Sequence, residues 1–181
     1  MPFRVRAVLL AALLSCVTAA LPARAQTPAA APEQALKAVL FYKLPLFTYR
    51  APGVRHDTVL LCHLGRSPLE QTLVSLAEAP VEGLASKLRL LRSTHEARDC
   101  NFIFIARSEA DRVAAVLAEL NRPGLVTVSD IPGFARSGGM VELGVRERRE
   151  GLSIIINRVA SRKAGVEFMA QLLRLAEVID E

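Results

Sequence analysis

The stretch NFIFIARSEADRVAAVLAELNRPGLVTVS, residues 101–129, decides the fold. It opens with a compact apolar run at 101–106 and closes with a second at 125–129, both of strand length. Between them Ser108 is placed to cap a helix and residues 121–124, Asn-Arg-Pro-Gly, to end it. The apolar positions between these signals have helical spacing: Val113, Val116, Leu117 and Leu120. A strand, a helix and a strand in this order predict two parallel strands joined by a helix.

Towards the N-terminus the same alternation continues. Apolar residues from Glu33 to Pro45 recur at helical spacing and predict an amphipathic first helix. Residues 58–64 form a second apolar run of strand length, and Ser67 followed by Pro68 predicts the start of another helix. Residues 84–91 offer a further strand. Ser93 with Glu96 three residues later predicts a capping box around one short turn.

Towards the C-terminus the pattern changes to a hairpin and a helix. Residues 140–145 and 152–156 are apolar runs joined by a polar turn at 146–151, which predicts a β-hairpin. Asn157 can cap a long closing helix that reaches Ile179, with Gly165 inside it marking a bend or a close contact. The link between 91 and 101 is short for a parallel crossover and indicates a mixed sheet. The fold class is therefore α/β, with helices packed on a mixed, mostly parallel sheet in one domain.

The first 25 residues have the pattern of a cleaved secretory signal. Arg4 and Arg6 precede an apolar run, and Ala23-Arg24-Ala25 fits the cleavage site, so the signal is expected at 1–25. Residues 26–32, QTPAAAP, then form a flexible lead-in to a domain over 33–181. Two alternatives stay open: a permanent transmembrane helix, and a lipoprotein attached at Cys16. The expected location is the periplasm.

Charge and length limit the class of protein. The full chain has 23 basic and 18 acidic residues. Cleavage after Ala25 removes three arginines and no acid, which leaves 20 basic against 18 acidic residues. Such a balance, with both signs interleaved, argues against a nucleic-acid partner. About 155 mature residues suit one domain with a real core.

Cleavage also leaves Cys62 and Cys100 as the only two cysteines. An even pair in an exported chain predicts a disulfide, although two buried thiols that never meet are the alternative. A cysteine nucleophile with His63 as its base is disfavoured, because neighbours in a strand point to opposite faces of the sheet.

The sequence contains no recognisable catalytic or metal-binding motif. The three histidines do not have the spacing of a zinc site, and neither Ser67 nor Ser137 lies in a nucleophile elbow. We therefore expect no catalytic residue, no metal and no cofactor.

The loop in VTVSDIPGFARSGGMVEL, residues 126–143, raises the question of phosphate binding. Gly133 and Gly138 have the spacing of a P-loop, but Gly139 and Met140 stand where that motif needs Lys and Ser or Thr. The loop is interpreted as a structural bend with an exposed tip. Because paired glycines allow close approach of another molecule, the candidate partner or ligand loop is Arg136, Ser137, Gly138 and Gly139.

Several segments together resemble the YfiR family of periplasmic proteins. In chain order they are ALKAVLFYKLPLFT, LLCHLGRSP, CNFIFIA, VTVSDIPGFARSGGMVEL and IIINRVASRKAGVEFMAQLLRLAEVI. The likeness runs from about Ala35 to Ile179. Its specific elements are the Cys62 and Cys100 pair, the loop from Ser129 to Gly139, and Asn157 followed by the segment with Leu172 and Leu173.

The resemblance implies a regulator without known catalysis. Members bind the periplasmic sensor region of an inner-membrane GGDEF diguanylate cyclase and repress it, which lowers cyclic di-GMP and biofilm formation. A peptidoglycan-associated outer-membrane lipoprotein can relieve this repression by sequestering the regulator. The family's redox sensitivity is carried over only onto Cys62 and Cys100. A homodimer is left open.

This chain departs from the family pattern at two features. Many members have Trp-Pro after the first helix, whereas this chain has Phe47-Thr48-Tyr49-Arg50-Ala51 and no Trp, and the second disulfide of some members has no counterpart. Since a fold does not determine a function, the alternative is a periplasmic small-ligand-binding sensory module that works with a histidine kinase or a transporter.

Overall fold

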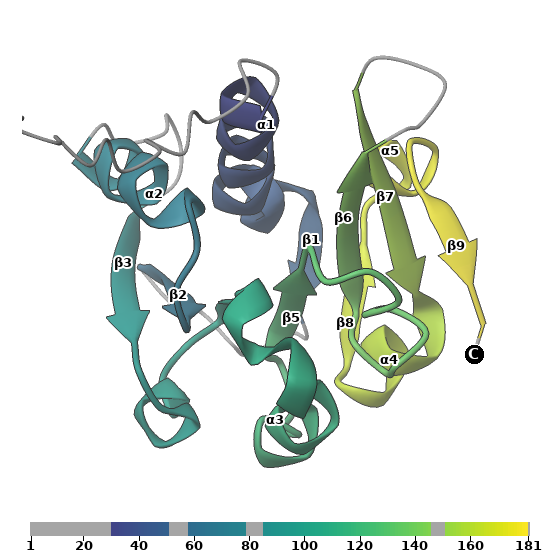
Figure 1. Ribbon diagram of the computed structural model, residues 1–181. Coiled ribbons are helices and arrows are strands. Elements are labelled where there is room, and N and C mark those ends of the chain that lie inside the picture. The colour runs from purple at the N-terminus through teal and green to yellow at the C-terminus, as the bar shows by residue number, and fades with distance from the viewer. Residues whose placement is uncertain (1–29, 51–57, 79–84, 146–150, 181) are drawn as a thin grey trace, which may run out of the picture.

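The computed structural model describes residues 30–50, 58–78, 85–145 and 151–180, which form one α/β arrangement around a central sheet (Figure 1). The α-helices are α1 (Ala30–Lys43), α2 (Leu69–Glu78), α3 (Val113–Glu119), α4 (Arg158–Lys163) and α5 (Ala170–Leu173). Three 3-10 helices are η1 (Leu44–Phe47), η2 (Thr94–Ala97) and η3 (Arg107–Arg112). The strands are β1 (Thr48–Arg50), β2 (Val59–Leu64), β3 (Ser86–Leu91), β4 (Phe102–Ile105), β5 (Val126–Ser129), β6 (Val141–Val145), β7 (Leu152–Asn157), β8 (Val166–Phe168) and β9 (Glu177–Ile179).

The main sheet is mixed and mostly parallel, as the sequence predicts. Its order is β3-β2-β4-β5-β6-β7-β9, with β3 at one edge and β9 at the other (Figure 1). Only the β6–β7 pair is antiparallel, and it is the predicted hairpin. A separate antiparallel pair joins β1 to β8.

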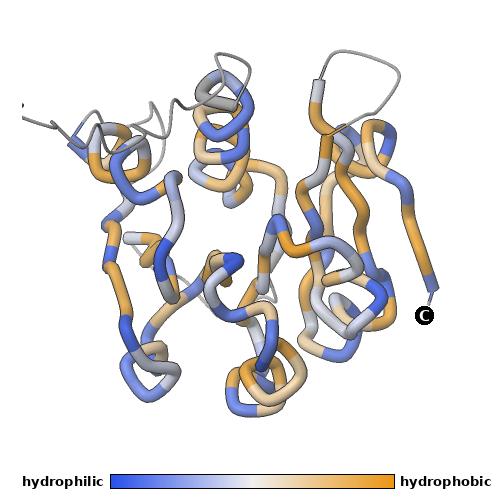
Figure 2. The backbone as a smooth tube through the Cα atoms, viewed as in Figure 1, coloured by the Kyte–Doolittle hydropathy of each residue, from blue (hydrophilic) through white to orange (hydrophobic). Residues whose placement is uncertain are grey.

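The two faces of the main sheet carry two hydrophobic clusters. Helices α1 and α2 cover the first face, where Phe41 packs edge-on against Phe104 with ring centroids 5.6 Å apart. Helix α3 and the loop after β5 cover the second face, to which Val116, Leu120 and Phe134 contribute buried side chains. Along β6, β7 and β9 the chain is largely hydrophobic, whereas the turn after β3 is hydrophilic (Figure 2). Because successive side chains of a strand point to opposite faces of the sheet, the central strands contribute residues to both clusters.

Three of the predicted helix starts are confirmed at atomic level. The Ser67 hydroxyl accepts from the Leu69 N–H before α2, and the Ser93 and Glu96 capping box is complete at η2. The Asn157 Oδ1 accepts from the Ala160 N–H, so Asn157 caps α4. These signals are local, which explains why they can be recognised without knowing the fold.

The prediction that Ser108 caps the helix after β4 is wrong. That segment begins as the 3-10 helix η3, whose N-cap is Ala106, and the α-helix proper starts only at Val113. The Ser108 hydroxyl instead accepts from the Arg66 N–H at 2.9 Å. The Ser108 side chain therefore joins the segments that follow the neighbouring strands β2 and β4, and it does not cap a helix.

The predicted long closing helix is also wrong. Helix α4 ends at Lys163, and Gly165 then adopts a left-handed conformation with φ of 68°. The remaining residues form β8, the short helix α5 and β9. Strand β8 pairs with β1, and β9 extends the main sheet beside β7. Hydrogen bonding to these strands therefore decides the structure of this segment, although its apolar residues have helical spacing.

Two smaller expectations are also corrected. The link from β3 to β4 is a parallel crossover despite its length, since both strands run parallel to β2. Helix α1 begins at Ala30, so the last three residues of the expected lead-in are helical. The signal sequence, Cys16, residues 26–29 and most of the polar turn at 146–151 lie outside the described residues.

Candidate functional site

The glycine loop between β5 and β6 is a tight, internally bonded bend. The Phe134 O accepts from the Gly139 N–H at 3.0 Å, and the Gly133 O accepts from the Ser137 N–H at 2.9 Å. Gly133 and Gly138 have positive φ angles of 78° and 96°, which glycine adopts without strain. A Cβ at Gly139 would lie 2.1 Å from the Phe134 ring. The absence of a side chain at Gly139 therefore serves internal packing.

Two buried polar side chains from the hairpin hold this loop in shape. The Glu142 carboxylate accepts from the Gly133 and Ala135 N–H groups, each at 3.0 Å. The Asn157 amide nitrogen donates to the Ala135 O at 2.8 Å. Glu142 and Asn157 therefore hold the buried side of the loop, whereas its tip, residues 136–138, is exposed to solvent. Glu142 was not recognised from the sequence, although an acid inside the apolar run MVELGV was a usable signal.

A buried ion cluster ties the first helix to the start of this loop. The Lys37 Nζ is fully buried and lies 3.1 Å from the Asp130 Oδ2 and 2.5 Å from the Glu33 Oε1. The Arg107 Nε donates to the same Asp130 oxygen at 3.1 Å. A buried cation is tolerated only when it is paired, so these contacts hold α1 against the end of β5. Sequence reasoning missed this cluster, because Lys37 and Asp130 are 93 residues apart along the chain.

The predicted loop residues differ in exposure. Arg136, Ser137 and Gly138 are exposed, whereas Gly139 is buried. The Arg136 guanidinium lies 3.6 Å from the Glu177 carboxylate of the edge strand β9. Gly138 also lines a hollow of about 330 Å³ between the end of α3 and α4, whose floor includes Leu125, Thr127 and Met140. The structure thus places the loop tip at the rim of a surface hollow.

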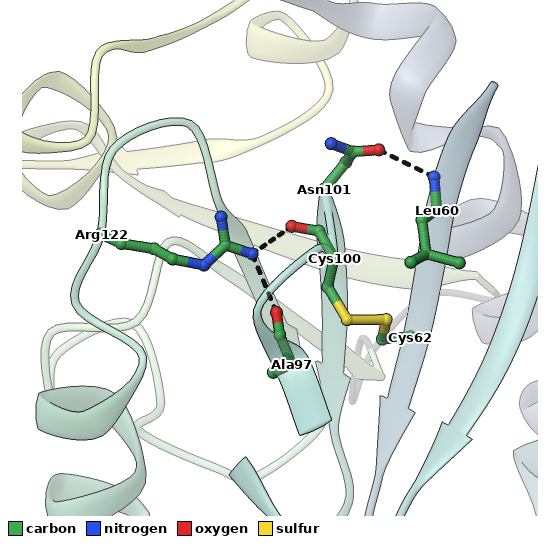
Figure 3. The surroundings of a disulfide bond; sticks show 6 residues. All are labelled: Leu60, Cys62, Ala97, Cys100, Asn101 and Arg122. Carbon is green, nitrogen blue, oxygen red and sulfur yellow. Dashed lines mark hydrogen bonds between the residues drawn. A yellow bond between two sulfur atoms is a disulfide. The ribbon is translucent and has the colours of Figure 1, made fainter. Parts of the chain in front are cut away.

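The two cysteines form the predicted disulfide. Cys62 of β2 and Cys100 before β4 are bonded, with 5.9 Å between their Cα atoms, and both are fully buried (Figure 3). Beside the bond, Leu60 and Asn101 exchange two hydrogen bonds of 2.8 and 2.9 Å. The Arg122 guanidinium donates to the Ala97 O at 3.0 Å and to the Cys100 O (Figure 3).

His63 faces away from its cysteine neighbour, as expected. Its ring stacks on Phe104 with an interplanar angle of 5°, and its Nε2 lies 2.7 Å from the Ser67 hydroxyl. Burial lowers the pKa of His63, and the nearby Glu70 carboxylate opposes this shift only in part. A buried imidazole that stays neutral and is bonded to a helix-capping serine is a structural element of the first core.

Within the described residues, no cluster of His, Cys, Asp and Glu could hold a metal ion. No helix in that same part of the chain is long and apolar enough to cross a membrane. The structure is therefore an α/β domain with one disulfide, Cys62–Cys100, among the described residues. Its glycine loop between β5 and β6 is held by hydrogen bonds from Glu142 and Asn157.

The chain belongs to the YfiR/HmsC-like family, whose profile matches residues 34–177. This family is regulatory and non-catalytic, is periplasmic, and indicates a role in cyclic di-GMP signalling. The resemblance noted in the sequence is thereby confirmed. No curated protein matches the chain.

A likeness of fold is shown by the first of two solved structures. An ABC domain in complex with L-Trp from Streptococcus pneumoniae is 12% identical, with a TM-score of 0.51, over 82% of this chain and 62% of that chain. A conserved domain protein from Vibrio cholerae O1 biovar El Tor is 16% identical, with a TM-score of 0.48, over 81% of this chain and 60% of that chain. This chain thus spans less than two thirds of either protein.

Proposed function

We propose that this protein binds the periplasmic sensor region of an inner-membrane GGDEF diguanylate cyclase and represses it without catalysing a reaction. The observation that carries the proposal is the family match over 34–177, together with the Cys62–Cys100 disulfide expected of an exported chain. Repression lowers cyclic di-GMP and biofilm formation. Relief comes from a competing partner such as a peptidoglycan-associated outer-membrane lipoprotein.

Repression of this kind requires differential binding. A regulator shifts its partner only if it prefers the inactive arrangement, and a preference of about 5.5 kcal/mol gives nearly complete switching. The glycine loop suits such a contact because its exposed tip, Arg136 to Gly138, directly follows the segment from Gly133 to Ala135, which Glu142 and Asn157 hold. A contact surface that is already ordered loses little conformational entropy on binding.

Deletion of the gene tests the proposal in the cell. We expect raised cyclic di-GMP and surface attachment in the deletion strain, and restoration of both by the wild-type gene. Tagged protein should capture a GGDEF protein from detergent-solubilised inner membranes. Unchanged cyclic di-GMP together with no captured cyclase contradicts the proposal.

A pair of charge reversals tests the loop separately. Arg136→Glu should weaken capture of the cyclase, whereas Arg174→Glu, an equal charge change at another exposed position, should leave it unchanged. Equal capture by both variants would place the contact elsewhere on the molecule and leave repression itself intact.

The second candidate function is a small-ligand-binding sensory module partnered with a histidine kinase or a transporter. The hollow of about 330 Å³ beside Gly138 favours it, and the similar ABC domain was solved with L-Trp. A thermal-shift screen with periplasmic metabolites distinguishes the candidates, since a ligand well above its Kd raises the apparent stability. A hit that raises Tm, combined with no effect of deletion on cyclic di-GMP, would favour this second function.

A further inference from the structure

A second hollow lies at the amino ends of the neighbouring strands β3, β2 and β4, and Arg122 lines both this hollow and the one beside Gly138. Its volume is about 480 Å³ and its walls come from the starts of β2 and β3 and from the segments before β4 and after α3. The charged residues in these walls are Lys87, Arg89, Arg98, Asp99 and Arg122. We call this site the cationic hollow.

The strand register explains why cations line it. Ser86 of β3 shares a hydrogen bond of 2.7 Å with the Tyr42 hydroxyl of α1, which lies on the first face of the sheet. Because neighbouring residues of a strand alternate, Lys87 and Arg89 occupy the second face. There Lys87 pairs in register with Leu60 and Arg89 with Cys62, and both cations are exposed.

Within the described residues, Asp99 balances the positive charge of this hollow only in part. Its walls hold four cations and one acid, and no ion pair is formed there by Lys87, Arg89 or Arg98. By contrast, Arg107 and Arg162 pair with carboxylates. Cations on an edge strand can serve to prevent pairing with another chain. That role accounts for Lys87 and Arg89 on β3 but not for Arg98 or Arg122, which lie on other segments.

The inner wall presents fixed hydrogen-bond donors. The guanidinium of the half-buried Arg122 is held by the carbonyls of Ala97 and Cys100, so it is positioned before any ligand arrives (Figure 3). The Asn101 Oδ1 accepts from the Leu60 N–H, which leaves the amide nitrogen as the atom turned away from β2 (Figure 3). The disulfide anchors this wall, because Cys100 supplies one of the two carbonyls that hold Arg122.

We propose that the cationic hollow binds a small anion that carries two or more phosphate or carboxylate groups. The volume falls in the ordinary range of small-molecule sites, about 300 to 1,000 Å³. Fixed donors at Arg122 and Asn101 suit one group, and the exposed cations Lys87, Arg89 and Arg98 suit a second. Bonds between such cations and oxyanions are charge-assisted and therefore strong. The lining of this hollow does not include the loop tip at Arg136 to Gly138.

The same anionic group can belong to a free molecule or to the headgroup of an anionic lipid. Binding of pyrophosphate and of citrate to the purified mature protein is measured by calorimetry at low salt. Binding to phosphatidylglycerol vesicles is measured by co-sedimentation, with phosphatidylcholine vesicles as the neutral control. Pyrophosphate or citrate binding supports a soluble ligand, and binding to phosphatidylglycerol vesicles alone supports the lipid source.

Matched pairs of variants test the position. Arg89→Gln with Arg98→Gln should weaken binding about tenfold or more, since both removed charges face the ligand. Arg158→Gln with Arg162→Gln removes the same charge from α4, where both residues are exposed and pair with Asp180, and should change Kd by less than about twofold. The proposal is overturned if both pairs weaken binding equally, or if neither the two anions nor the anionic vesicles bind.

Discussion

Replacing Glu142 by Gln should loosen the glycine loop and destabilise the whole domain. The carboxylate offers one oxygen to the Gly133 N–H and the other to the Ala135 N–H. Glutamine offers only one oxygen, so its amide group would face a backbone donor and one of the two bonds would be lost. A bond to a charged acceptor contributes about 1.5 to 3 kcal/mol, and an unsatisfied buried donor adds to the loss. We therefore expect Glu142→Gln to lower the free energy of unfolding by about 2 to 4 kcal/mol.

Urea unfolding of the purified mature protein measures the change in the free energy of unfolding, and thermal unfolding measures the change in Tm. For a domain of this size, a loss of about 3 kcal/mol corresponds to a fall in Tm of about 6 to 12 °C. Amide exchange at Ala135 should accelerate together with it. Glu167→Gln is the matched control, because Glu167 is exposed on β8, and should change stability by less than about 0.5 kcal/mol. If Glu142→Gln is no more harmful than the control, the carboxylate does not hold the loop.

Three other predictions concern the disulfide, the buried histidine and the paired glycines. Cys100→Ser should lower the free energy of unfolding by about 3 to 4 kcal/mol in the chain-entropy model, because the bond closes a loop of 38 residues; coincident urea curves would contradict this. Burial lowers the folded-state pKa of His63 below the ordinary histidine value of 6.5, so stability that is present above this value should be lost as pH falls towards the folded pKa. His63→Gln should flatten this dependence in unfolding curves between about pH 7 and 5, and an unchanged slope would assign it to other groups. Gly139→Ala should lower the free energy of unfolding by about 1 to 3 kcal/mol, because the Phe134 ring must move. Gly138→Ala meets open space and should lower it by about 1 to 2 kcal/mol through backbone strain alone. Urea midpoints should show the larger loss for Gly139→Ala.

Local signals in the sequence predicted much of the chain. The Ser93 and Glu96 capping box, the Asn157 cap and the hairpin of β6 and β7 each depend on residues close together along the chain. The two strands expected within 101–129 are parallel, as predicted. They are β4 and β5, and the helical segment of η3 and α3 connects them directly. The disulfide was predicted from cysteine count and export, and needed no geometry.

Contacts between distant segments decided the rest. Residues 166–179 have helical spacing, yet only Ala170–Leu173 are helical, and β8 and β9 form because β1 and β7 offer edges with which they pair. Ser108 bonds the Arg66 N–H instead of capping a helix. The ion pair of Lys37 with Asp130 exists only after the strands have their final order. The same holds for the convergence of Lys87, Arg98 and Arg122 on one hollow. Hydrogen bonds and charges act over a few ångströms in space, so a sequence determines by itself only those that join near neighbours, and the tertiary structure decides those that join remote ones.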